Sequence, residues 1–364
     1  SLEFSAAVSD VSGSLPAGGY RMFDPQGRVI VLRPDYTLAI SRLAGTRFPD
    51  HPGPVRLSYI GRVFRPPPTG KPRPAEQLQA GAELIDASGP EADAEVISLM
   101  IASLAAADAG DVRVAIGDVE LTEELIRSVE VTETAREQLR RALRERDIVG
   151  WGAALKATGV SGESAEILAR LPRIRGGPEV LEEIVAAVPG AEGSCRWLAR
   201  TLELIEAHGG GASVSVDLSV VRDRPYYSGV VFEAHVSGVA TPVAAGGRYD
   251  RLSGRFGEHR SAAGFGISLQ VLNRVLSSGA SRPSREGVVV AGAMNGGLAA
   301  AASVRSAGIA VVALPPDGDP EAVAAAEGWR YAARPAGVGF DVLDRETDER
   351  FACADLGEAL SSRR

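Results

Sequence analysis

Lysine is almost absent from this chain of 364 residues, occurring only at Lys71 and Lys156, and the net charge is −8. A protein that binds nucleic acid through the phosphates normally carries a basic patch, and none stands out here. We therefore expect no nucleic-acid partner. We attribute the scarcity of lysine, beside abundant arginine and alanine, to the base composition of the genome and not to the function of the protein.

Cysteine and histidine are also rare. The two cysteines, Cys195 and Cys353, lie far apart, and the four histidines show no metal-ligand spacing. Such a composition is typical of a reduced, cytoplasmic protein without disulfides. We expect no metal site and no cofactor.

Long hydrophobic runs are missing, although 45% of the residues are hydrophobic. No run is long enough to span a bilayer, so we expect no membrane association. No basic and apolar leader is visible at the start, and nothing suggests export. The length predicts two domains as a starting expectation.

Hydrophobic periodicity divides the first 276 residues into strands and helices. The expected elements are a hairpin over 21–32, a helix over 37–44, strands over 55–64 and 78–85, a helix over 91–109, a strand over 112–116, a helical insertion over about 119–208, strands resuming at 213, and a strand passing into a helix over 262–275. Residues 277–286 read as a polar linker. Residues 287–364 form a small α/β appendage, with elements expected over 288–291, 296–307, 309–314 and 320–327.

The segment from Arg222 to Asp250 places a cation and two tyrosines, Tyr226 and Tyr227, before an apolar strand. Residues 241–245 read as the return strand, and Gly246-Gly247 as a tight turn. A guanidinium group beside phenol rings suits the binding of a small zwitterion. The N–H donors of the guanidinium group pair with a carboxylate, and the rings pack against an aromatic side chain. The alternative is structural, with the tyrosines packed on the sheet and Arg222 paired with an aspartate.

Two further segments place polar side chains at strand ends. Asp35 and Thr37 follow the predicted hairpin, where both can accept hydrogen bonds from an ammonium group. The alternative role for them is a helix N-cap. Gln79 and Glu83 share one face of a predicted strand, with Gly81 between them leaving room for a ligand. The alternative there is an exposed polar strand face.

A last segment, Ala263 to Leu272, reads as a buried glycine-containing strand followed by a helix. In this order and spacing the segments resemble the catalytic core of class II aminoacyl-tRNA synthetases, specifically histidyl-tRNA synthetase. Leu32-Arg33-Pro34-Asp35-Tyr36-Thr37 is similar to its LRPxxT signature, and Val63-Phe64-Arg65 with Gln79-x-Gly81-x-Glu83 to its motif 2. The resemblance spans roughly residues 1 to 276. It implies an α+β fold: an antiparallel sheet with a helical insertion, followed by a small α/β C-terminal appendage.

The resemblance also implies roles for individual residues. Asp35, Thr37 and Gln79 would hold the α-ammonium of histidine. Glu83 and Tyr227 would grip the imidazole. Arg222 would face the carboxylate, and Tyr226 and Tyr249 would form part of the wall.

Some of the residues with which the synthetases bind ATP are replaced in this sequence. Pro67 stands where motif 2 has an acidic residue, and Val271 where motif 3 has the arginine that clamps the ATP phosphates. A valine offers no hydrogen-bond donor to a triphosphate. Residues 287–364 carry seven arginines and no lysine against eleven acidic residues, a poor surface for tRNA.

A synthetase-like core that keeps its histidine pocket and loses ATP and tRNA binding is similar to the regulatory subunits of ATP phosphoribosyltransferase. That resemblance implies a non-catalytic protein that activates a short catalytic subunit in the first step of histidine biosynthesis and transmits feedback inhibition by L-histidine. It implies a self-dimer inside a hetero-octamer with the catalytic subunit. The alternatives are an active histidyl-tRNA synthetase, another ATP-dependent amino-acid ligase, or a scaffold with a vestigial pocket.

Overall fold

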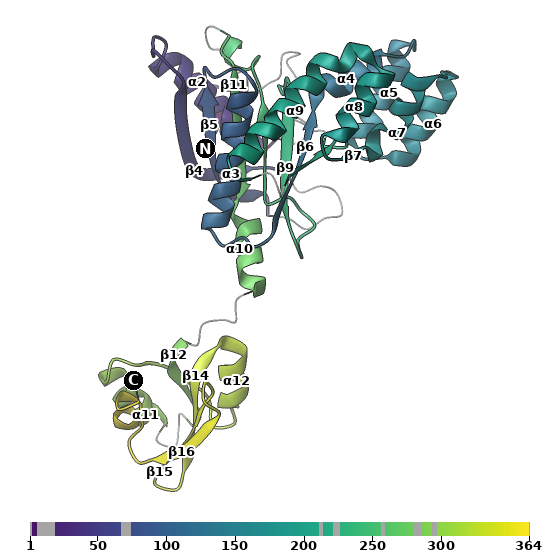
Figure 1. The fold of residues 1–364 in the computed structure, drawn as a ribbon. Coiled ribbons are helices and arrows are strands. Elements are labelled where there is room, and N and C mark those ends of the chain that lie inside the picture. The colour runs from purple at the N-terminus through teal and green to yellow at the C-terminus, as the bar shows by residue number, and fades with distance from the viewer. Residues whose placement is uncertain are drawn as a thin grey trace. The chain divides into compact units, whose positions relative to one another are not determined.

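The computed structural model describes residues 2–5, 19–66, 74–210, 214–220, 226–255, 259–279, 285–292 and 297–363. The chain forms two compact units, residues 1–276 and residues 277–364 (Figure 1). Within the described ranges, no helix is long and apolar enough to cross a membrane.

An eight-stranded sheet forms the centre of the first unit, in the order β4-β5-β11-β10-β9-β6-β8-β7. Neighbouring strands are antiparallel, except β6 and β8, which are parallel. The strands are β4 (Val55–Phe64), β5 (Glu76–Ile85), β6 (Val112–Asp118), β7 (Arg175–Gly176), β8 (Val214–Asp217), β9 (Val230–Val236), β10 (Ala244–Arg248) and β11 (Ala262–Ser268). A second, three-stranded sheet has the order β1-β3-β2, with β1 (Leu2–Phe4), β2 (Arg21–Phe23) and β3 (Val29–Leu32).

Helices α2 (Thr37–Arg47), α3 (Pro90–Ala106) and α10 (Leu269–Gly279) accompany this sheet. A helical insertion leaves the sheet after β6 and returns through β7 to β8 (Figure 1). Its helices are α4 (Val119–Arg127), α5 (Glu133–Arg144), α6 (Ile148–Thr158), α7 (Glu163–Arg170), α8 (Glu179–Ala187) and α9 (Glu192–Ala207).

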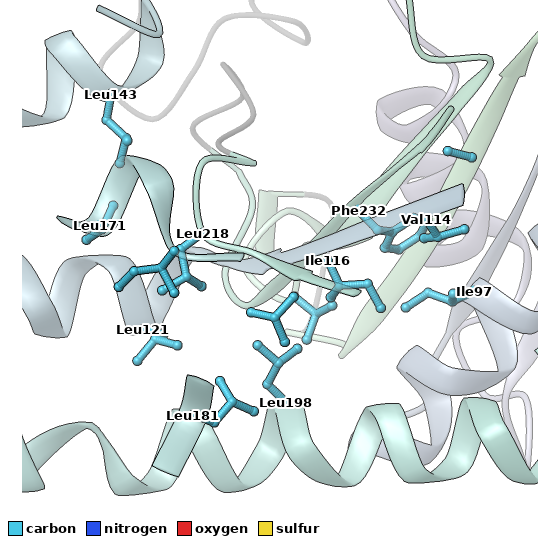
Figure 2. Packing of buried hydrophobic residues seen from close by; sticks show 14 of the residues in the cluster. Ile97, Val114, Ile116, Leu121, Leu143, Leu171, Leu181, Leu198, Leu218 and Phe232 are labelled. Carbon is cyan, nitrogen blue, oxygen red and sulfur yellow. The ribbon is translucent and has the colours of Figure 1, made fainter. Parts of the chain in front are cut away.

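Strand alternation sends apolar and polar side chains to opposite faces of the large sheet. Ile116 of β6 and Phe232 of β9 are buried in the same hydrophobic cluster as Leu198 of α9, as Figure 2 shows. The buried Arg248 of β10 lies on this covered face and is ion-paired with Asp93 of α3 at 2.8 Å. The opposite face therefore carries Gln79, Glu83 and Glu233, whose side chains alternate with the apolar ones.

Gly246 and Gly247 lie inside strand β10, so the predicted turn at these residues is wrong. Both are paired with neighbouring strands, and neither has a positive φ. A Cβ at Gly247 would come within 2.8 Å of the Tyr227 ring, and one at Gly246 within 2.6 Å of the Phe232 ring. These glycines are needed for close packing and not for a change of chain direction.

The second unit is a five-stranded sheet in the order β13-β12-β14-β15-β16, with helices α11, α12 and α13. Its elements are β12 (Arg285–Val290), α11 (Leu298–Ser306), β13 (Ala310–Ala313), α12 (Pro320–Glu327), β14 (Trp329–Ala336), β15 (Gly339–Asp344), β16 (Glu349–Cys353) and α13 (Leu356–Ser361). The first four match expected segments, whereas the antiparallel β14–β16 and helix α13 were not predicted. Helix α10 ends at Gly279 and β12 begins at Arg285, both inside the expected linker of 277–286.

Candidate functional site: a polar cavity on the open face of the sheet

A cavity of about 230 Å³ lies over the face of the large sheet that α3 and α9 do not cover. Its floor includes Gln79 of β5, Gly264 and Gly266 of β11, Ala245 of β10 and Glu233 of β9. The register confirms that these residues share a face, because Gly266 pairs with Gly81 and with Ala245, which in turn pairs with Glu233. The helical insertion also reaches the cavity, through Arg146.

The glycines of β11 give the polar side chains of β5 the space they occupy. A Cβ at Gly264 would overlap the carboxyl group of Glu83, which is paired opposite it, and a Cβ at Gly266 would overlap the amide of Gln79. Any other residue at these positions would displace the two side chains. The glycines of β11 and the polar residues of β5 are therefore complementary, because each glycine leaves the space that a polar side chain of β5 fills.

Glu83 is a buried carboxyl group whose pKa is strongly raised. Its side chain is buried, with Oε1 accepting from the Thr37 hydroxyl at 2.8 Å and Oε2 from the Tyr249 hydroxyl at 2.5 Å. Burial raises the pKa of Glu83 to about 8, although both hydroxyl donors oppose the shift; nearby Asp35 adds to it. Glu83 does not itself line the cavity, but Thr37 and Tyr249 do. The Thr37 and Tyr249 hydroxyls thus lie between the cavity and the Glu83 carboxyl group.

Gln79 presents a buried acceptor to the cavity. Its Oε1 has no hydrogen-bond partner in the described part of the protein. A buried amide oxygen without a partner costs free energy, so a donor entering the cavity recovers that cost. An ammonium group is such a donor.

Aromatic rings form the wall beside these polar groups. The Tyr226 ring centroid lies 4.9 Å from that of Tyr227 and 6.1 Å from that of Tyr249. Tyr59 of β4 stacks on Tyr36 at 4.6 Å on the other side. Burial raises the pKa of both Tyr249 and Tyr59, so their hydroxyls remain protonated donors.

Asp35 and Thr37 lie where β3 passes into helix α2. Tyr36, and not Asp35, is the N-cap residue of α2, and its side chain makes no capping bond. Asp35 Oδ1 accepts from the Leu38 amide only at 3.5 Å, the upper limit for a hydrogen bond. The buried Asp35 and the neighbouring Thr37 line the cavity, so their positions favour a binding role over capping alone.

The cavity thus brings together most of the residues singled out from the sequence. Asp35, Thr37, Gln79, Tyr226 and Tyr227 line it, and Glu83 lies directly behind Thr37. Arg222 and Pro67 lie outside the described residues. No described group of three His, Cys, Asp or Glu side chains is arranged to hold a metal ion.

Two residues of the cavity, Arg146 and Glu233, were missed. They form an ion pair at 3.0 Å at the cavity wall. Nothing local to Arg146 distinguishes it from other arginines of the insertion. Tyr249, which was expected in the wall, lines the cavity, and its hydroxyl donates to Glu83.

The remaining wall comes from the start of α10. Val271 is 5% exposed and belongs to the hydrophobic cluster that packs the covered face. Gln270 Oε1 accepts from the Leu78 amide at 3.0 Å, which ties α10 to β5. A packed aliphatic side chain therefore stands at the position where the resemblance to the synthetases implies a phosphate-binding arginine.

The comparisons agree with this geometry. The family model of histidyl-tRNA synthetase matches residues 1–272. ATP phosphoribosyltransferase regulatory subunits are among the curated relatives. That of Symbiobacterium thermophilum is 38% identical over 92% of this chain and 79% of the relative. That of Moorella thermoacetica is 38% identical over 85% of this chain and 81% of the relative. The chain belongs to this family of regulatory subunits.

A solved structure extends the regulatory-subunit similarity to three dimensions. A protein described as an ATP phosphoribosyltransferase regulatory subunit/histidyl-tRNA synthetase from Bacillus halodurans has a TM-score of 0.71 and 31% identity, covering 92% of this chain and 88% of that one. Histidyl-tRNA synthetase from Nostoc shares the fold, with a TM-score of 0.66 at 20% identity, covering all of this chain and 90% of that one. The predicted class II synthetase-like architecture is confirmed.

Proposed function

We propose that this chain is a non-catalytic regulatory subunit of ATP phosphoribosyltransferase that binds free L-histidine in the cavity described above. The proposal rests on one observation: the cavity has polar groups that suit an amino acid and an aliphatic side chain where the synthetases bind phosphate. Polar groups suited to an amino acid gather around Gln79 and Glu83, while Val271 occupies the place of the phosphate clamp. Such a site retains groups for an amino-acid ligand and lacks the arginine with which the synthetases clamp the ATP phosphates.

In the proposed complex, the α-ammonium group of histidine donates to Gln79 Oε1 and to the carboxyl group of Asp35. The Thr37 hydroxyl turns from Glu83 toward the ammonium, and an imidazole nitrogen takes its place on Glu83. Tyr227 contacts the same ring, with Tyr226 beside it, and Arg222 faces the carboxylate. Ligands that lack a matching ring nitrogen leave the buried Glu83 poorly paired and are rejected strongly.

The proposed partner is the short catalytic subunit of ATP phosphoribosyltransferase, in a hetero-octamer built on dimers of this chain in the cytoplasm. The family name supports a catalytic partner. Histidine binding and partner activity are then thermodynamically linked, with a coupling of about 1–3 kcal/mol in typical allosteric proteins. Ligands of the catalytic subunit alter histidine affinity by the same factor.

Calorimetry on the isolated chain tests the binding site, with L-histidine and ATP titrated separately. We expect saturable heat from L-histidine and none from ATP. Histidine-dependent exchange of pyrophosphate into ATP would instead show an active synthetase or another amino-acid ligase. Absence of any histidine binding would leave only a scaffold role.

A further inference from the structure

Arg146 connects the helical insertion with the floor of the cavity. Arg146 Nη2 donates to Glu233 Oε2 at 3.0 Å, across 87 positions of sequence. Both residues line the cavity. Within the described residues, no other hydrogen bond or ion pair joins residues 132–158 to the large sheet.

The backbone at Arg146 is held in an unfavourable conformation. Helix α5 ends at Arg144, and Arg146 has a φ of 56°. The Arg146 amide donates to the Leu143 carbonyl at 3.1 Å and the Asp147 amide to the Ala142 carbonyl at 2.8 Å, the pattern of a Schellman motif. Glycine is the usual residue at this position, because a side chain there is sterically disfavoured. An arginine kept where glycine fits better points to a use for its side chain.

Hydrogen bonds hold the segments on both sides of Arg146 in place. The Arg146 guanidinium therefore points to the cavity. Asp147 caps the next helix, α6, by accepting from the Gly150 amide at 2.8 Å. The Glu233 partner is buried on β9, whereas the Arg146 side chain is 59% exposed. The ion pair alone is therefore weak. The Nε and Nη1 hydrogens of Arg146 have no protein acceptor in the described part of the chain.

We propose that Arg146 is a second ligand-binding cation of the site, which holds Glu233 with one arm and takes the carboxylate of the bound amino acid with the other. Ligand binding then fastens helices α5 and α6 over the cavity. The insertion becomes the element that responds to occupation of the site. This inference rests on the proposed binding of L-histidine in the cavity.

Hydrogen exchange on the full chain, with and without L-histidine, tests the coupling. In the wild-type protein we expect saturating L-histidine to slow amide exchange in residues 132–158 at least threefold. In Arg146→Gln we expect that slowing to vanish and the Kd for L-histidine to rise about tenfold, because a charge-assisted bond to the carboxylate is lost. Arg144→Gln is the matched control, since Arg144 pairs with Glu137 of its own helix and does not line the cavity.

Arg146→Gly guards against a folding artefact, because glycine suits the backbone at this position. Exchange rates of residues 132–158 without ligand should match wild type in a folded variant. The inference is overturned if wild-type protein binds L-histidine with unchanged exchange in 132–158, or if both Arg146 variants keep wild-type affinity and protection. If the wild-type protein does not bind L-histidine at all, the proposed function fails first and this inference with it.

Discussion

The Tyr249 hydroxyl donates to Glu83 Oε2 at 2.5 Å, and both side chains are buried. Tyr249 follows Arg248, whose buried ion pair with Asp93 fixes the end of β10 against α3. The carboxyl group that recognises the proposed ligand is thus positioned through a tyrosine held by a core ion pair.

Histidine affinity should be highest between about pH 6.5 and pH 8. The pKa of Glu83 is raised to about 8, while a free imidazole titrates near about 6.5. A carboxyl–imidazole pair shares one proton, so binding must take up a proton above pH 8 and release one below pH 6.5. Both requirements weaken binding outside the window.

Calorimetry from pH 5.5 to pH 9 in two buffers of different ionisation enthalpy measures this proton exchange. Glu83→Gln should bind L-histidine more weakly than wild type, and its affinity should no longer fall above pH 8. A fall above pH 8 that persists in Glu83→Gln would assign the titration to another group.

Stability should also report the proton on Glu83. The folded-state pKa of about 8 lies above the ordinary 4.5, so the folded protein binds this proton more tightly than the unfolded chain does. This contribution is complete below pH 4.5 and is lost as the pH rises through 8.

Compared with wild type, Glu83→Gln should be similar in stability near pH 5 and more stable by roughly 2–4 kcal/mol near pH 8.5. Urea unfolding at both pH values gives the difference. Burial also raises the pKa of Asp118, to about 7. The contribution of Asp118 to the pH dependence is the same in both proteins and cancels in the comparison. A pH-independent difference would contradict the raised pKa.

Gly264→Ala should abolish ligand binding while leaving the protein folded. The new methyl group would overlap the Glu83 carboxyl group and push it from Thr37 and Tyr249. Gly53→Ala is the control, because a Cβ there meets nothing within 4 Å. Calorimetry with L-histidine should separate the two variants, and equal affinities would show that Glu83 is not needed for binding.

Asp93→Ala should lower the free energy of unfolding by about 3–5 kcal/mol, because it leaves the buried Arg248 without its main partner. Arg248 donates to Asp93 at 2.9 Å, and Trp197 Nε1 donates to the same carboxylate at 2.8 Å. On the same helix, Glu95→Ala breaks only an exposed pair with Arg56 and should cost about 0.5 kcal/mol. Denaturant unfolding measures both, and similar losses would mean that the core pair contributes little.

The sequence predicted the elements that local patterns determine. Strand Val55–Phe64 and helix Pro320–Glu327 have the predicted bounds, since prolines and turn residues mark where each begins or ends. Gly246-Gly247 was misread because a glycine can allow a turn or a close approach, and only the neighbouring Phe232 and Tyr227 rings decide between them.

The polar residues of the site followed from strand alternation and from the resemblance to the synthetases. Arg146 did not, because its approach to Glu233 depends on how the insertion folds back over the sheet. The burial of Glu83 behind Thr37 also depends on α2 packing against β5, which no local pattern encodes.

The bare backbone of β11 limits how the cavity can be redesigned. Gly264 and Gly266 already contribute no side-chain atoms, and their space is filled by Glu83 and Gln79. Admitting a bulkier amino acid therefore requires trimming an aromatic ring such as Tyr226 or Tyr227, because that wall still has atoms to remove.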